Sequence, residues 1–285
     1  MGHHYNPRKH LQRFRSDGEK HNCIWMYDKT TRVFTWAGIS GVAAEDGFYD
    51  EDVEKALAHA IEGPSNPVVD KILSRKMLDN EERSRLTLYM LTMSTRGPRQ
   101  RRKSIDQAPK CLSKVFQETR SQFQAWADEN GADSELQSNR LQELNRLESQ
   151  YANTTPEYVQ RLIRTPFVSE QLLECLHNMF WHILPAPPGT FFITSDTPAH
   201  YFEGMGLGNP KSEFTFPLSK GIALLGEHQH SHGMAYEKPD AQLVKEVNRR
   251  ILSVTERFVF SPKNEPWIDS VAQKAYPFLT SIRWN

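Results

Sequence analysis

The clearest pattern in the chain is a helical repeat of apolar residues between positions 79 and 96. The pattern consists of Leu86, Tyr89, Met90 and Met93, whose i, i+3, i+4, i+7 spacing is that of one buried helix face. Asp79 or Asn80 is suited to cap the start, and Gly97 and Pro98 end the helix. Arg96 continues the same stripe, so we predict that it lies on the core side of this helix near its C-terminal end.

Other segments repeat this helical pattern. The predicted apolar faces are Leu112, Val115, Phe116, Phe123 and Trp126, stopped by Gly131; Leu172, Leu176, Met179, Phe180 and Ile183, ended by the Pro-rich run 185–189; and Val244, Val247, Ile251 and Val254, capped by Asp240. Two further pieces are expected from Asp52 to Ile61 and from Pro67 toward Leu73, separated by Gly63-Pro64.

Short β-rich runs lie near both ends of the chain. Ile24–Tyr27 and Val33–Trp36 flank a turn and predict a hairpin. Further strands are predicted at Phe191–Thr194, Phe214–Phe216, Ile222–Leu225 and Phe258–Phe260. The pattern therefore predicts an α+β fold: a mainly helical core with a small mixed or antiparallel sheet, formed by the N-terminal hairpin and the C-terminal strands.

We expect a single domain over residues 1–285. The stretch from Ser134 to Tyr151 is polar apart from four leucines, which is typical of a helix outside the core. We therefore predict a helical insertion at 132–155.

Composition limits the location and the partners. The 35 basic and 35 acidic residues cancel, so any polyanion site must be local. No run approaches the roughly 20 apolar residues of a membrane span, and the first residues lack the apolar stretch of a secretion signal. Three widely spaced cysteines fit reduced thiols. These features predict a cytoplasmic protein with no membrane partner; cofactors and oligomeric state stay open.

Several motifs occur in a specific order along nearly the whole chain. They are His4-Tyr5-x-Pro7 with Leu11 and Phe14, Ile24-Trp25-x-Tyr27-Asp28, Phe48-Tyr49, Glu82-Arg83 through Arg96-x-Pro98, Thr194-Ser195-Asp196-x-Pro198, and Phe216-Pro217-Leu218-Ser219. In this order the chain resembles the uncharacterised family DUF4238. Asn6 departs from the family pattern, which more usually has a valine there. The resemblance implies a shared fold and brings no established reaction.

The leading candidate site follows the predicted strand Phe191–Ile193. Asp196 is suited to act as a general base or metal ligand, and Ser195 as a donor to a substrate. The alternative is structural, because Ser or Asp ahead of a proline commonly begins a turn or caps a helix.

Arg96 and His4 are the other two candidate catalytic residues. A guanidinium on a buried face needs an anionic partner, which is either a protein carboxylate or a bound phosphate or carboxylate. An unperturbed histidine titrates near neutrality, so His4 suits acid or base catalysis; the alternative is that it packs the terminus together with Tyr5. Arg99 begins a basic tract that could hold phosphates or could simply be solvated. We take Tyr5 and Arg99 as candidate substrate-binding residues.

Two other motifs are weaker candidates. His228, His230 and His232 have a spacing that could bind a metal ion, but we interpret them as a solvated turn, and we predict no metal site. The glycines at 204, 206 and 208 are followed by a strand rather than a helix, so they lack the geometry of a dinucleotide loop.

Three functional hypotheses remain. The first is phosphodiester hydrolysis, in its concrete form an RNA nuclease, with His4 as acid or base, Arg96 as anion clamp and Asp196 as orienting carboxylate. The second is a non-catalytic module that binds a nucleotide or another anion. The third is a protein-interaction module in which these residues form a structural polar network. The first two require an open site, so accessibility separates them from the third.

Overall fold

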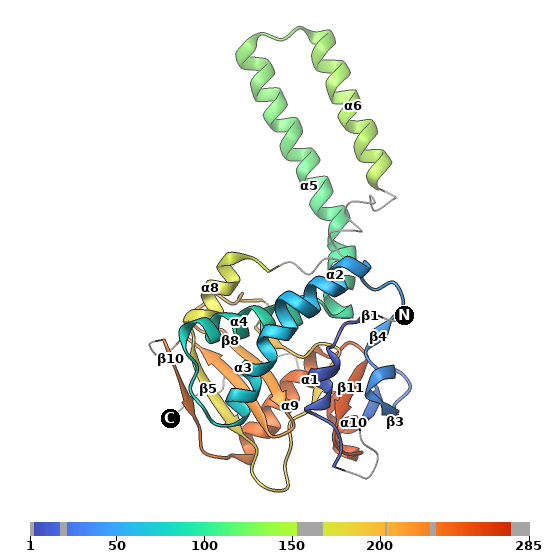
Figure 1. The fold of residues 1–285 in the computed structure, drawn as a ribbon. Helices are drawn as coiled ribbons and strands as arrows, with labels where there is room; N and C mark the ends of the chain where they lie inside the picture. The colour runs from blue at the N-terminus through green and yellow to red at the C-terminus, as the bar shows by residue number, and fades with distance from the viewer. Residues whose placement is uncertain (1–2, 18–21, 153–167, 203, 229–231, 275–285) are drawn as a thin grey trace. The chain divides into compact units, whose positions relative to one another are not determined.

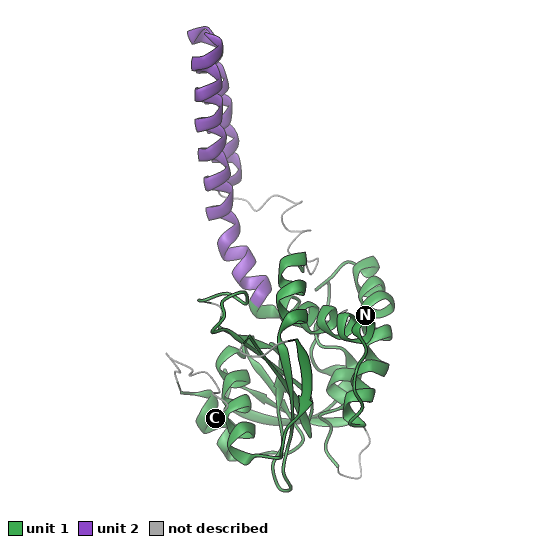
Figure 2. Ribbon diagram, turned by 90° about the vertical axis from the view of Figure 1, so that its left-hand side faces the viewer, with its two compact units in different colours: residues 1–99, 166–285 green, residues 100–165 purple. Residues whose placement is uncertain are grey.

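The computed structural model describes residues 3–17, 22–152, 168–202, 204–228 and 232–274. The chain divides into two compact units, which Figure 2 colours separately. Unit 1 comprises Met1–Arg99 and Pro166–Asn285, and unit 2 comprises Gln100–Thr165. No helix among the described residues has the length and apolar character needed to cross a bilayer.

The first large sheet of unit 1 contains strands from the N-terminal and C-terminal parts of the chain. Its order is β3 (Val33–Gly38), β2 (Cys23–Asp28), β11 (Phe258–Ser261) and β6 (Thr194–Ser195), with antiparallel pairing throughout. The fold is α+β as predicted, and the N-terminal hairpin pairs with the C-terminal strand β11. The strands predicted at 214–216 and 222–225 do not join this sheet, because they pair with each other and with further strands in a second sheet. A two-stranded ribbon joins β1 (His3–His4) to β4 (Ala44–Glu45).

A second, five-stranded sheet is mixed. Its order is β10 (Gly233–Tyr236), β5 (Phe180–Pro185), β9 (Ile222–Glu227), β8 (Glu213–Ser219) and β7 (His200–Tyr201). Only β10 and β5 run parallel among these pairs. The prediction of one helix through Ile183 is wrong in its second half. The helix α8 (Glu170–Asn178) stops before Met179, and Phe180 begins strand β5. In β5 the backbone N–H and C=O groups pair with β10 on one side and with β9 on the other.

The helices cover the sheets. They are α1 (Arg8–Gln12), η1 (Ile39–Gly41), α2 (Glu51–Ala56), the π-helical η2 (Leu57–Glu62), α3 (Gly63–Leu73), α4 (Asn80–Thr95), α9 (Ala241–Val254) and α10 (Pro266–Ala272). Of the two predicted caps of α4, Asp79 is the N-cap, and it forms a capping box with Glu82. The expected break at Gly63-Pro64 is absent, because Pro64 lies in the first turn of α3, where its missing N–H costs little.

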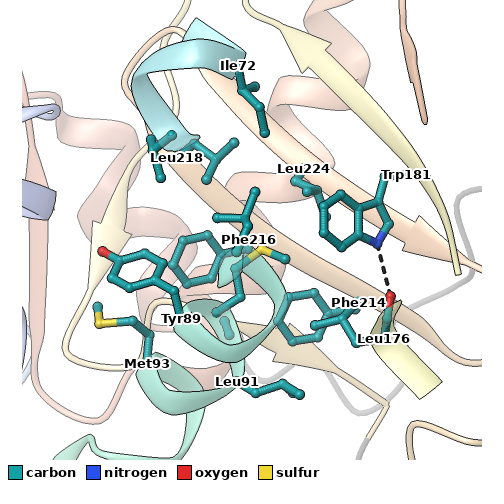
Figure 3. Packing of buried hydrophobic residues seen from close by; sticks show 14 of the residues in the cluster. Ile72, Tyr89, Leu91, Met93, Leu176, Trp181, Phe214, Phe216, Leu218 and Leu224 are labelled. Carbon is teal, nitrogen blue, oxygen red and sulfur yellow. Dashed lines mark hydrogen bonds between the residues drawn. The ribbon is translucent and has the colours of Figure 1, made fainter. Parts of the chain in front are cut away.

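The core lies on both faces of the five-stranded sheet. Alternate residues of β8 point to opposite sides, and Phe214, Phe216 and Leu218 pack with Tyr89 and Trp181 in one cluster under α3, α4 and α8 (Figure 3). On the other face Thr215 meets Arg250 of α9. Figure 1 shows α4 and α9 on the two sides of the sheet.

Unit 2 contains two antiparallel helices, most of α5 (Pro98–Asn130) and all of α6 (Ser134–Ala152). Gly131 ends α5 with a positive φ of 61°, which a glycine adopts without strain. Arg120 of α5 pairs with Glu148 and donates to Asn145 at 3.1 Å. The unit begins at residue 100, upstream of the insertion expected at 132–155, and the last three residues of that insertion lie outside the described residues.

Candidate functional site

Asp196 lies directly after β6 and is almost completely buried. Its carboxylate accepts three backbone N–H groups, from Glu256 at 2.9 Å, Arg257 at 2.6 Å and Phe258 at 2.8 Å. Burial raises the pKa of Asp196 to about 6, and the three N–H donors oppose that rise. The carboxylate therefore anchors the connection between α9 and β11.

Ser195 is also held inside the protein. Its hydroxyl donates to the Thr197 carbonyl at 2.8 Å and accepts from the Thr197 N–H at 3.1 Å, which closes a tight turn. Asn6 donates its side-chain N–H to the Ser195 carbonyl at 2.6 Å. Ser195 is fully buried, so the turn-forming interpretation of this residue fits its contacts better than a role in binding substrate.

Arg96 lies on the core side of α4, as predicted, with a side chain that is only 1% exposed. One Nη donates to Glu62 Oε1 at 2.6 Å, and the other donates to the main-chain carbonyl of His4. Tyr49 donates to the main-chain carbonyl of Arg96 at 2.5 Å. The guanidinium thus has a protein carboxylate as its anionic partner and ties the chain start to α4.

His4 is held by Arg8, whose Nε donates to His4 Nε2 at 2.9 Å. An arginine can only donate, so His4 Nε2 must be the unprotonated nitrogen, and Nδ1 carries the hydrogen. Burial lowers the pKa of His4, and the positive charge of Arg8 lowers it further. The ring is therefore neutral at pH 7, and the basic nitrogen is already occupied.

Tyr5 and Arg99 are the two candidate substrate-binding residues outside these contacts. Tyr5 is buried against Phe48, with ring centroids 5.5 Å apart, and burial together with the Asp196 charge raises the pKa of its hydroxyl. Arg99 is half-buried. Burial lowers the pKa of His200 to about 3, and the positive charges of Arg250 and Arg99 lower it further.

We call His4, Asn6, Arg96, Ser195 and Asp196 the Asp196 centre. The structure brings these residues together from three distant segments, and the approach is close: a Cβ at Gly97 would lie 2.5 Å from the Asp196 carbonyl oxygen. Their polar groups mainly bond one another or the backbone, in the interior. This arrangement favours the structural network of the third hypothesis, and the catalytic roles of His4, Arg96 and Asp196 stay a prediction.

A ligand-sized hollow lies elsewhere in unit 1. This hollow, the α9–α10 cleft, has a volume of about 580 Å³ and is lined by residues of the 189–191 segment, α9 and α10. Phe191 and Trp267 form an aromatic wall, with ring centroids 6.1 Å apart. Asn248 fixes this wall to α9, since its side chain accepts from the Ile193 N–H at 3.0 Å and donates to the Phe191 carbonyl at 2.8 Å.

The charged groups of the α9–α10 cleft come from two elements. Lys245 and Arg249 line it from α9, four residues apart, and Glu265 lines it from the residue that precedes α10. Arg249 also pairs with Glu246. Val244 and Val271 complete the apolar surface. An apolar wall with a few charged groups is the usual composition of a small-molecule site.

The sequence pattern does not single out Lys245, Glu265 or Trp267. Three segments far apart in the chain supply the α9–α10 cleft, and no local spacing links them. The one available signal is Glu265-Pro266-Trp267, which marks a helix start carrying a large aromatic ring.

Within the described residues, no group of three or more His, Cys, Asp or Glu side chains is arranged to hold a metal ion. Of the His-rich run, His230 lies outside the described residues, and His228 contacts the Leu207 carbonyl at 2.8 Å.

The fold and these features define a two-sheet α+β protein with a buried polar centre and a separate cleft. Residues 2–265 match the model of the family described as "Protein of unknown function (DUF4238)". The chain belongs to this family, which confirms the resemblance of its motifs. No curated protein and no solved structure matches the chain.

Proposed function

We propose that the chain is a binding module for a nucleotide or a similar anion that carries an aromatic ring, and that the α9–α10 cleft holds this ligand. The observation that carries the proposal is the combination of about 580 Å³ of space with an aromatic wall and two cationic side chains. Pockets for small ligands commonly span about 300–1,000 Å³.

The chemistry of the lining fits the two parts of such a ligand. Trp267 and Phe191 offer flat apolar surface on which a base can stack. Lys245 is exposed, and Arg249 lies one helical turn further along α9, so both can reach a phosphate at the edge of the cleft. The cytoplasm, our proposed location, supplies nucleotides as ligands.

Phosphodiester hydrolysis at the Asp196 centre has less support. A general base needs a free lone pair within reach of a substrate proton. Three backbone N–H groups take up most of the acceptor capacity of the buried Asp196 carboxylate, and Arg8 occupies Nε2 of His4. Arg96 is paired with Glu62 in the interior. An RNA substrate for this centre therefore stays a prediction that no contact favours.

Calorimetric titration of the full chain with AMP, GMP, CMP and UMP tests the proposal. We expect binding by at least one nucleotide, and we expect Trp267→Ala to weaken it at least about fivefold, because base stacking on an aromatic ring contributes about 1–3 kcal/mol. Lys245→Ala should weaken the nucleotide more than the matching nucleoside, which has no phosphate.

Matched controls are available in unit 2. Trp126→Ala removes a tryptophan that is 49% exposed, and Lys114→Ala removes an exposed lysine, so both should leave binding unchanged. Circular dichroism confirms that each variant is folded. Absence of binding by all four nucleotides at millimolar concentration, with folded protein, would refute the proposal.

A further inference from the structure

We infer that the ligand of the α9–α10 cleft is a free guanine mononucleotide, with Glu265 binding the edge of the guanine base. This inference rests on the proposed function and adds the identity of the base. It depends on three features of the cleft: a Glu265 carboxylate that has no partner among the described residues, its position beside Trp267, and the separation of acidic from basic groups.

Glu265 is a half-buried carboxylate with no hydrogen bond or ion pair to any other described side chain or backbone group. It stands at the N-cap position of α10, yet its side chain does not cap the helix. A carboxylate beside apolar surface loses hydration, and that cost is offset only when donors replace the lost water. In a cleft built for an anion, these donors must belong to the uncharged part of the ligand.

Guanine presents such donors. Its ring N1–H and its exocyclic amino group lie side by side on one edge, so a carboxylate can accept both in a bidentate arrangement. Adenine presents a ring acceptor beside its amino group, and the acceptor would face a negatively charged oxygen. The smaller pyrimidines fill less of a cleft of about 580 Å³.

The remaining groups are placed consistently with this assignment. Trp267 follows Glu265 by two residues, so the carboxylate and the stacking surface enter the cleft from the same end of α10. Lys245 and Arg249 enter from α9, a different element. A nucleotide has the same division, with hydrogen-bond donors on its base and negative charge on its phosphate.

The test compares GMP and AMP binding by calorimetry for the full chain and for Glu265→Gln. The unaltered chain should bind GMP at least tenfold more tightly than AMP. The glutamine variant keeps the size of the side chain but offers one acceptor and one donor, so it should lose at least tenfold in GMP affinity and keep or improve AMP affinity. Glu135→Gln in α6 is the matched control and should change neither affinity.

Each outcome has one meaning. GMP and AMP binding of equal affinity to the unaltered chain, or unchanged GMP binding by Glu265→Gln, would overturn the guanine assignment and leave the proposed function standing. Absence of binding by both nucleotides would remove the proposed function as well. A pentaribonucleotide with one central guanine that binds more tightly than GMP would overturn the assignment to a free mononucleotide.

Discussion

Three backbone N–H groups converge on the carboxylate of Asp196, and this one side chain therefore holds the start of β11 against β6. We predict that Asp196→Asn destabilises the protein by about 1–3 kcal/mol, because an amide nitrogen cannot accept and leaves at least one buried N–H without a partner. Urea denaturation at about pH 4 measures the change, because the folded carboxyl is then protonated and neither variant carries a buried charge. A variant as stable as the unaltered chain would show that these contacts do not contribute.

The titration of Asp196 makes the free energy of unfolding depend on pH. Burial raises its pKa from 3.8 in an exposed chain to about 6 in the folded protein, so the folded state binds the proton more tightly than the unfolded state. The stability that this proton contributes is present below about pH 4 and is lost as pH rises through about 6. The difference of about two pKa units corresponds to about 3 kcal/mol. Comparing denaturation midpoints at several pH values should show this component in the unaltered chain and its absence in Asp196→Asn.

Between α4 and α5, two backbone segments pack directly against each other without an intervening side chain. Gly97 lies against the Asp196 carbonyl, and an added Cβ would come within 2.5 Å of that oxygen. We predict that Gly97→Ala destabilises the fold by about 1–3 kcal/mol through overpacking.

Gly41 provides the control for this substitution. Nothing lies within 4 Å of an added Cβ at Gly41, and its backbone does not require a glycine. The stability of Gly41→Ala should stay within about 0.5 kcal/mol of the unaltered chain. Equal losses for both variants would mean that the close approach at Gly97 does not limit the packing.

Helix ends follow from the sequence better than strand assignments do. Asp79 and Asp240 cap their helices through bonds to residues two or three positions ahead, so the signal is local. The pattern predicts Asp240 and narrows the cap of α4 to Asp79 or Asn80. Phe180–Ile183 continues the apolar period of α8. It nevertheless forms β5, because the strands at 222–227 and 233–236 pair with it. Such distant partners are not visible in a local pattern.

At the scale of the molecule, the described residues of unit 1 form its apolar core. The three clusters of buried apolar residues contain none of the described residues from 100–152. We predict that replacing residues 100–165 by a Gly/Ser linker of about ten residues leaves a chain that unfolds cooperatively, with a denaturation midpoint close to that of the full chain. Loss of cooperativity in urea would show that unit 1 depends on unit 2.

The candidate sites were predictable to different degrees. The helical period of α4 predicts that Arg96 lies in the interior, as it does. The first hypothesis also assumes that His4, Arg96 and Asp196 converge, and the structure brings these segments together. Their partners were not predictable, because Glu62 and the N–H groups of 256–258 come from separate segments. The α9–α10 cleft has no local signature at all, since the fold alone assembles its wall from Phe191 and Trp267.

A crystal structure of the full chain grown with saturating GMP tests the central claim most directly. We predict electron density for the nucleotide in the α9–α10 cleft, with the base against Trp267 and the phosphate within hydrogen-bonding distance of Lys245 or Arg249. Nucleotide density at the Asp196 centre and not in the cleft, or an empty cleft at saturating ligand, would contradict the account.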